Sequence, residues 1–132
     1  MRVVFDSNIF VSALAFPGGR ADAALQRILD GTDILLVSPA IIDEVLRVLA
    51  EKFSRDREEL SRVALLLSEL AETVRPVGRL ALLADEPDNR ILECAVAGKA
   101  AAIVTGDKAM LMLKKYRQIK IISLSEFLRQ SS

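Results

Sequence analysis

The sequence predicts an α/β fold of three layers, with helices on both faces of a central parallel sheet of about five strands. Short apolar runs alternate with stretches of helical periodicity along the whole chain, and two of these runs end on an aspartate. Arg2–Phe5 leads into Asp6, and Ala102–Thr105 leads into Gly106 and Asp107. An apolar run that ends on an acid and then changes to helical period is typical of the carboxyl edge of a parallel sheet, where open α/β folds bind ligands.

Five segments have strand character and are separated by helical stretches. The predicted strands are Arg2–Phe5, Asp33–Val37, Thr73–Val77, Ala101–Thr105 and Lys120–Ile122. A first helix is expected to begin near Ile9, and the other helical stretches are Ala21–Leu29, Pro39–Lys52, Asp56–Ala71, Pro87–Ala97, Lys108–Leu113 and Ser125–Arg129.

Local signals support the helix boundaries. The helix at Ala21–Leu29 follows a turn made by a proline and two glycines, and Ser38 is a good N-cap with a proline at the first helical position. The stretch Asp56–Ala71 carries four aliphatic side chains on one stripe. Gly98 is a good C-terminal stop for Pro87–Ala97.

Length and composition predict a single domain over residues 1–132. Hydrophobic residues make up 52% of the chain, yet no apolar run approaches the ~20 residues of a membrane span. The N-terminus lacks the order of charge, apolar stretch and small residues found in a signal peptide, because Asp6 interrupts it early. We therefore expect a cytoplasmic protein with no membrane partner.

Residue types that are absent or rare exclude several kinds of chemistry. The chain has no histidine, which excludes a Ser-His-Asp triad and imidazole zinc sites. Its one cysteine, Cys94, excludes an internal disulfide and is expected to pack in the core. With 18 basic and 18 acidic residues the net charge is zero, so nucleic acid would have to be bound by a local patch, such as the basic stretch Lys108–Lys120.

Four acids are candidates for a site at the sheet edge: Asp6, Glu44, Asp88 and Asp107. Each also has a structural explanation. Asp6 and Asp107 suit helix N-caps, and Asp88 suits the first turn of a helix, where the helix dipole favours an acid. Glu44 lies at the margin of an apolar helical stripe, as a surface glutamate would. Three acids within four positions, at Asp85-Glu86-Pro87-Asp88, exceed what capping needs and favour a functional role.

These segments together resemble the PIN domain family of metal-dependent nucleases. The motifs are Val4-Phe5-Asp6-Ser7-Asn8, Ile41-Ile42-Asp43-Glu44-Val45, the stretch from Asp85 to Ala95, and Val104-Thr105-Gly106-Asp107. The resemblance covers essentially the whole chain. It is nearest to the bacterial and archaeal group described as PIN-family toxins of toxin–antitoxin systems.

The resemblance implies a pocket of acids that binds Mg²⁺ or Mn²⁺, with Asp6, Asp88 and Asp107 as metal ligands and Glu44 as a residue that positions or deprotonates the attacking water. Thr105 matches the threonine or serine that often precedes the last acid by two positions. Asn8 is a supporting residue that would orient Asp6 or cap the first helix. Oxygen ligands with retained waters are what Mg²⁺ prefers, and the bound metal lowers the pKa of water.

The implied activity is metal-dependent endoribonuclease cleavage of single-stranded RNA, whose phosphates can bend into a narrow pocket. The implied partners are the RNA substrate, an antitoxin protein and a second copy of the chain. Two alternatives remain open: a non-catalytic PIN-fold interaction module, and a phosphotransfer domain with strand-tip aspartates. An aspartyl phosphatase would show Asp-x-Asp after its first strand, and Asp6-Ser7-Asn8 lacks the second acid.

Overall fold

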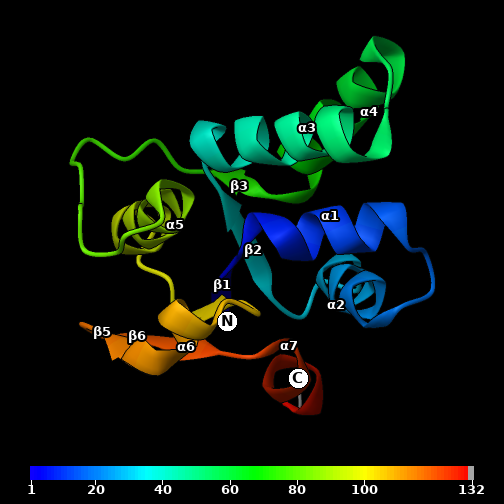
Figure 1. The fold of residues 1–132 in the computed structure, drawn as a ribbon. Helices are drawn as coiled ribbons and strands as arrows, with labels where there is room; N and C mark the ends of the chain where they lie inside the picture. Colours follow the sequence, from blue (N-terminus) through cyan, green and yellow to red (C-terminus); the bar gives the residue numbers. More distant parts are fainter. Residues whose placement is uncertain (131–132) are drawn as a thin grey trace.

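The computed structural model describes residues 1–130, which form a mixed α/β fold with helices on both faces of a mostly parallel sheet (Figure 1). The strands are β1 (Arg2–Phe5), β2 (Ile34–Val37), β3 (Glu72–Thr73), β4 (Ala102–Val104), β5 (Lys115–Tyr116) and β6 (Ile119–Ile122). The helices are α1 (Ser7–Ala15), α2 (Arg20–Leu29), α3 (Pro39–Phe53), α4 (Arg57–Leu70), α5 (Glu86–Ala97), α6 (Lys108–Leu113) and α7 (Leu124–Arg129).

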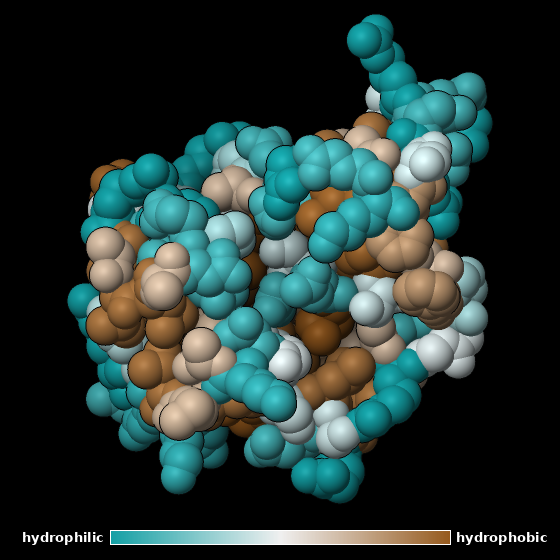
Figure 2. All heavy atoms as spheres, in the orientation of Figure 1, coloured by the Kyte–Doolittle hydropathy of each residue, from teal (hydrophilic) through white to brown (hydrophobic). Residues whose placement is uncertain are grey.

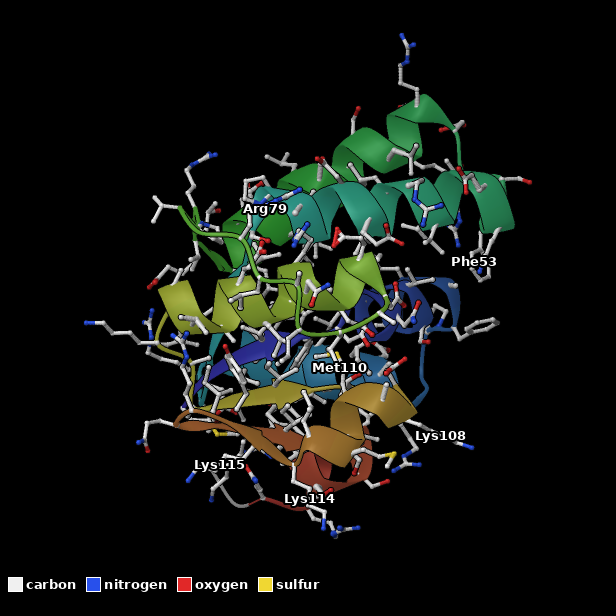
Figure 3. The ribbon with its side chains drawn as sticks, turned by 60° about the vertical axis from the view of Figure 1, so that its left-hand side comes forward. Phe53, Arg79, Lys108, Met110, Lys114 and Lys115 are labelled. Carbon is white, nitrogen blue, oxygen red and sulfur yellow. The ribbon has the colours of Figure 1, made fainter. Side chains whose placement is uncertain are left out.

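The sheet has the order β3-β2-β1-β4-β6-β5. Strands β3, β2, β1, β4 and β6 run parallel, and β5 pairs antiparallel with β6. Because the parallel strands share a direction, the ends of β1, β2, β3 and β4 meet at one edge of the sheet. Helices α5 and α6 cover one face and α1, α2 and α7 the other, while α3 packs against both α1 and α5 (Figures 1 and 3).

The fold class is confirmed, but the number of strands is six rather than about five. The additional strand, β5, spans only two residues and forms a tight hairpin in which Tyr116 faces Ile119. Arg117 in the turn has a φ of 56°, a left-handed conformation that non-glycine residues seldom adopt. The sequence shows no glycine or asparagine there to indicate a hairpin, so this turn was not predicted.

The third predicted strand, Thr73–Val77, is wrong over most of its length. The observed β3 is Glu72–Thr73, and the last parallel hydrogen bond beyond it runs from the Val74 amide to the Val37 carbonyl at 2.7 Å. Pro76 has no N–H to continue the ladder, and Val77 is fully exposed. From Arg75 the chain instead forms a long loop that leads to α5. The first helix also begins at Ser7, two residues before the predicted Ile9.

The core is built by the central strands and the helices on each face. Phe5, at the end of β1, has no exposed surface and its ring contacts Phe10 and Phe127, with centroids 5.7 and 5.5 Å away. Cys94 is fully buried, as expected, and burial raises the pKa of its thiol to about 12. Since Phe5 immediately precedes Asp6, this packing fixes the backbone from which the first acid projects.

Candidate metal centre

Three of the four predicted acids come together at the carboxyl edge of the sheet. Asp6 follows β1, Asp107 follows β4 one strand away, and Asp88 lies in the first turn of α5. Carboxylate oxygens of Asp85, Asp88 and Asp107 all lie within 4.8 Å of one another. The charge of Asp6 is close enough to raise the pKa of Asp88. Figure 2 shows a hollow near the middle of this face, with hydrophilic residues on its rim and hydrophobic residues within it.

Asp6 is a buried acid that is held by two donors. Its residue is 4% exposed; one carboxylate oxygen accepts from the Asn8 amide at 3.1 Å and the other from the Thr105 hydroxyl at 2.6 Å. Burial raises the pKa of Asp6, the two hydrogen bonds oppose that rise, and the charges of Asp107 and Asp85 add to it. The contact of Asn8 with Asp6 is through its backbone N–H; its own side chain is exposed beside the cleft.

Thr105 links the first acid to the last. Its side chain is fully buried, and its hydroxyl donates to Asp6 while its oxygen accepts from the backbone N–H of Asp107 at 3.0 Å. The hydroxyl therefore joins the ends of β1 and β4. This geometry gives a physical basis to the supporting role that the resemblance implied for Thr105.

Asp107 caps α6, and one of its oxygens accepts from the Met110 amide at 2.9 Å. Asp6 likewise caps α1 through the Asn8 amide. Both acids thus have the N-cap role that the sequence offered as a structural explanation. Capping occupies one carboxylate oxygen, however, and Asp107 also places a carboxylate oxygen in the group with Asp85 and Asp88. The structural and functional explanations are compatible.

Asp88 has the most perturbed carboxylate of the group. It is 5% exposed, and its Oδ2 is buried with no hydrogen-bond partner among the described residues. Burial raises the pKa of Asp88 to about 7, with further contributions from the charges of Asp107, Asp85 and Asp6. A buried carboxylate oxygen without a donor is costly unless a cation or proton satisfies it.

Asp85 is the member of the group to which the sequence assigned no site role. It occupies the N-cap position of α5, but its side chain makes no capping hydrogen bond, and it is exposed. Its carboxylate is therefore available to a ligand. The run of acids from Asp85 to Asp88 could have indicated a site role for Asp85. In a sequence, however, an acid just before a helix that begins with proline is explained as an ordinary N-cap.

Glu44 is not brought into this group. It projects from α3, and its carboxylate pairs with Arg47 one helical turn along, at 2.5 Å. It lines a neighbouring cavity of 160 Å³ together with Ser7 and Glu86. Two other polar residues of α5, Asn89 and Glu93, are buried and accept hydrogen bonds from the preceding loop, so they are structural residues.

The predicted basic stretch is divided by the fold. Lys108 begins α6 and lines a cleft of 550 Å³ with Asp6 and Asp107. Lys115 and Lys120 face each other across the β5–β6 hairpin, and Lys120 is in register with Ala102, at the opposite end of β4 from the acids. Figure 3 shows Lys108 apart from Lys114 and Lys115. Of the basic residues in this stretch, only Lys108 lines the acidic cleft.

The donor set fits a hard divalent cation. The charges of Asp6, Asp85 and Asp107 raise the pKa of Asp88, and three of these four carboxylates offer oxygens within 4.8 Å of one another. One buried oxygen, on Asp88, has no hydrogen-bond partner within residues 1–130. Mg²⁺ and Mn²⁺ bind carboxylate and water oxygens, and a cation here would favour the ionised forms that burial and mutual repulsion now disfavour. Fold and site together define an α/β domain with a carboxylate centre at the carboxyl edge of its sheet.

Comparison with known proteins assigns the family. The family model for the PIN domain matches residues 2–109, and the chain belongs to the PIN domain family. An uncharacterized protein of Methanocaldococcus jannaschii, MJ1680, is 29% identical over 131 residues, which cover 94% of this chain and 84% of that protein.

Two solved structures share the fold at 15% identity. VapBC2 from Rickettsia felis, bound to a promoter DNA fragment, has a TM-score of 0.66 over 93% of this chain and 98% of that chain. VapBC-1 from nontypeable Haemophilus influenzae has a TM-score of 0.67, over 95% and 99%. Within residues 1–130, none of the helices combines the length and apolar character that crossing a membrane requires.

Proposed function

We propose that this chain is a Mg²⁺- or Mn²⁺-dependent endoribonuclease that hydrolyses phosphodiester bonds of single-stranded RNA. The observation that carries the proposal is the convergence of Asp85, Asp88 and Asp107 beside buried Asp6. Membership of the PIN domain family supports it. The carboxylates have no basic partner of the kind a structural ion pair would provide; the nine ion pairs within residues 1–130 involve none of these four acids.

In this proposal Asp88 and Asp107 hold the metal, with Asp85 beside them and Asp6 completing the negative site. The bound cation would supply a water of lowered pKa and offset charge on the phosphorus. Thr105 and the Asn8 amide hold Asp6 in one orientation. Glu44 remains the candidate for orienting or deprotonating the attacking water, and its pair with Arg47 restricts its carboxylate.

The activity is tested with labelled single-stranded RNAs in Mg²⁺, Mn²⁺ or EDTA, comparing the wild type with Asp88→Asn and Asp6→Asn. We expect cleavage that needs the metal and falls by several orders of magnitude in both variants. The matched control is Asp43→Asn, which removes an exposed acid from α3. Equal cleavage by the wild type and Asp88→Asn would assign the activity to a contaminant and overturn the proposal.

We further propose that the chain acts as the toxin of a toxin–antitoxin pair in the cytoplasm. The sequence motifs that resemble PIN-family toxins support this role, as does the likeness of the fold to two VapBC structures. Expression of the wild type should arrest growth, and expression of Asp88→Asn at the same level should not. Equal growth of the two strains would contradict the toxin role while leaving the nuclease proposal to the cleavage assay.

A further inference from the structure

A second cavity at the same edge of the sheet carries the opposite charge. It measures 340 Å³ and lies where β3 ends and α3 begins. Of the residues that line it, three are arginines, Arg75, Arg79 and Arg90, and one is an acid, Glu93. No sequence motif indicated this cavity, because it depends on the path of the loop between β3 and α5.

The positive charge of this cavity is only partly compensated. Glu93 accepts from the Arg90 guanidinium at 2.7 Å, which neutralises one arginine. Arg75 and Arg79 are exposed and form no ion pair within residues 1–130. The Nε of Arg90 is buried without a hydrogen-bond partner in that same range. Two unpaired guanidinium groups in one cavity match an anion with several acceptor oxygens, such as a phosphate.

The loop that carries Arg75 and Arg79 is fastened to α5. The Leu80 amide donates to Glu93 at 2.7 Å, and the Leu80 carbonyl accepts from Arg90 at 2.9 Å. Further along, the amide and carbonyl of Leu83 both bond to the buried Asn89 side chain at 2.8 Å. The loop is thus attached to α5, the helix that also bears Asp88. The position of the arginines relative to this acid is therefore fixed by α5.

The arginine cavity and the carboxylates are close neighbours along the sheet. Arg75 follows β3 as Asp6 follows β1, and the two strands are separated only by β2. Two strand spacings amount to about 10 Å, a distance that a short oligonucleotide spans. The 160 Å³ cavity lies between them: it shares Arg90 with the arginine cavity and reaches Ser7, next to Asp6.

The negative charge of this passage is partly compensated. Its two acids, Glu44 and Glu86, pair with Arg47 at 2.5 Å and with Arg90 at 3.3 Å, and each arginine is shared with a second glutamate. Figure 3 places Arg79 beside α3, on the far side of α5 from Lys114 and Lys115. The lysine stretch that the sequence suggested for RNA is therefore on the other side of the molecule from this path, apart from Lys108.

We propose that Arg75 and Arg79 form a phosphate subsite for the RNA strand. They would hold a backbone phosphate near the scissile one while the carboxylates act on the latter. This inference rests on the proposed function for its substrate. Contacts to phosphate position a strand without reading its sequence, so the subsite should act on RNAs of any sequence.

The test measures RNA binding separately from cleavage. Fluorescence anisotropy of a labelled single-stranded RNA in EDTA gives Kd for the wild type, for Arg75→Ala/Arg79→Ala, and for Lys114→Ala/Lys115→Ala, which removes the same charge elsewhere. Each lost phosphate contact reduces the magnitude of the slope of log K against log salt by ~0.7. The Arg75→Ala/Arg79→Ala variant should therefore show a slope that is smaller in magnitude by about 1.4. The same variant should raise KM for cleavage, and the lysine pair should leave Kd, slope and KM unchanged.

The outcomes separate this inference from the proposed function. A wild type that binds RNA through the arginines but never cleaves it would contradict the nuclease proposal and retain the subsite. Cleavage by the wild type with equal binding losses in the two double variants would overturn the subsite and retain the nuclease. An equal loss of single-stranded DNA binding in the arginine variant would support a phosphate contact, because the phosphate is common to both polymers.

Discussion

Replacing Asp88 by asparagine should stabilise the metal-free protein while abolishing its proposed activity. The pKa of Asp88 rises from its ordinary 3.8 to about 7, chiefly because the carboxylate is buried. A difference of this size between the folded and unfolded pKa corresponds to at most about 4 kcal/mol above neutral pH. The site borders an open cleft, so solvent screening should reduce this to about 2 kcal/mol.

The sign of the pH dependence follows from the direction of the shift. The folded state binds the proton more tightly than the unfolded state, so ionisation of Asp88 destabilises the fold as pH rises from about 4 to about 7. The asparagine variant has no such ionisation. Its advantage over the wild type should be near zero at about pH 4, grow through this window and remain constant above it.

Urea unfolding in EDTA at several pH values measures this difference, with Asp43→Asn as a control for loss of an exposed acid. A stability difference that is flat from about pH 4 to 8 would refute the reasoning, as would a variant that is less stable than the wild type at pH 8. Adding Mg²⁺ or Mn²⁺ should make the wild type more stable than Asp88→Asn, since a ligand at 100 times its Kd stabilises the folded wild type by about 2.7 kcal/mol. The metal should stabilise the variant much less.

Three further changes test other parts of the structure. Thr105→Val removes the hydroxyl that binds Asp6 and should cost about 1–3 kcal/mol in urea unfolding while lowering cleavage; an unchanged rate would contradict its positioning role. Glu44→Gln should lose turnover yet keep more Mn²⁺ affinity than Asp6→Asn, and comparable loss by calorimetry would make it a direct ligand. Gly98→Ala places a Cβ 2.8 Å from Leu36 Cδ1 and should lower stability by about 1–3 kcal/mol, with a neutral result showing that the contact relaxes.

The sequence predicted the parts of the fold that depend on local rules. Strand ends that lead into Asp6 and Asp107 were located because apolar runs change to helical period there. The hairpin strand β5 was missed because it has two residues and a turn without glycine. The predicted third strand extends too far because Val77 is apolar and yet fully exposed.

The site was predictable to the extent that each acid has its own local signal. The density of acids around Asp88 predicts a site role for it, whereas an N-cap position explains Asp85 without one. The arginine cavity could not be predicted, since Arg75 and Arg79 become neighbours of the acids only through a loop whose path is set by Asn89 and Glu93. Convergence of this kind is a tertiary property.

Helix capping and the proposed metal centre draw on some of the same carboxylate side chains. A cap needs one oxygen at the start of a helix, and a carboxylate has two. Asp6 and Asp107 each give one oxygen to a cap, which fixes the carboxylate at the sheet edge with low conformational freedom. Asp88 has no cap to fix it and is instead buried, which accounts for its strongly raised pKa. The capping that begins α6 therefore also holds Asp107 beside Asp85 and Asp88, and the repulsion among these acids is what a divalent cation would relieve.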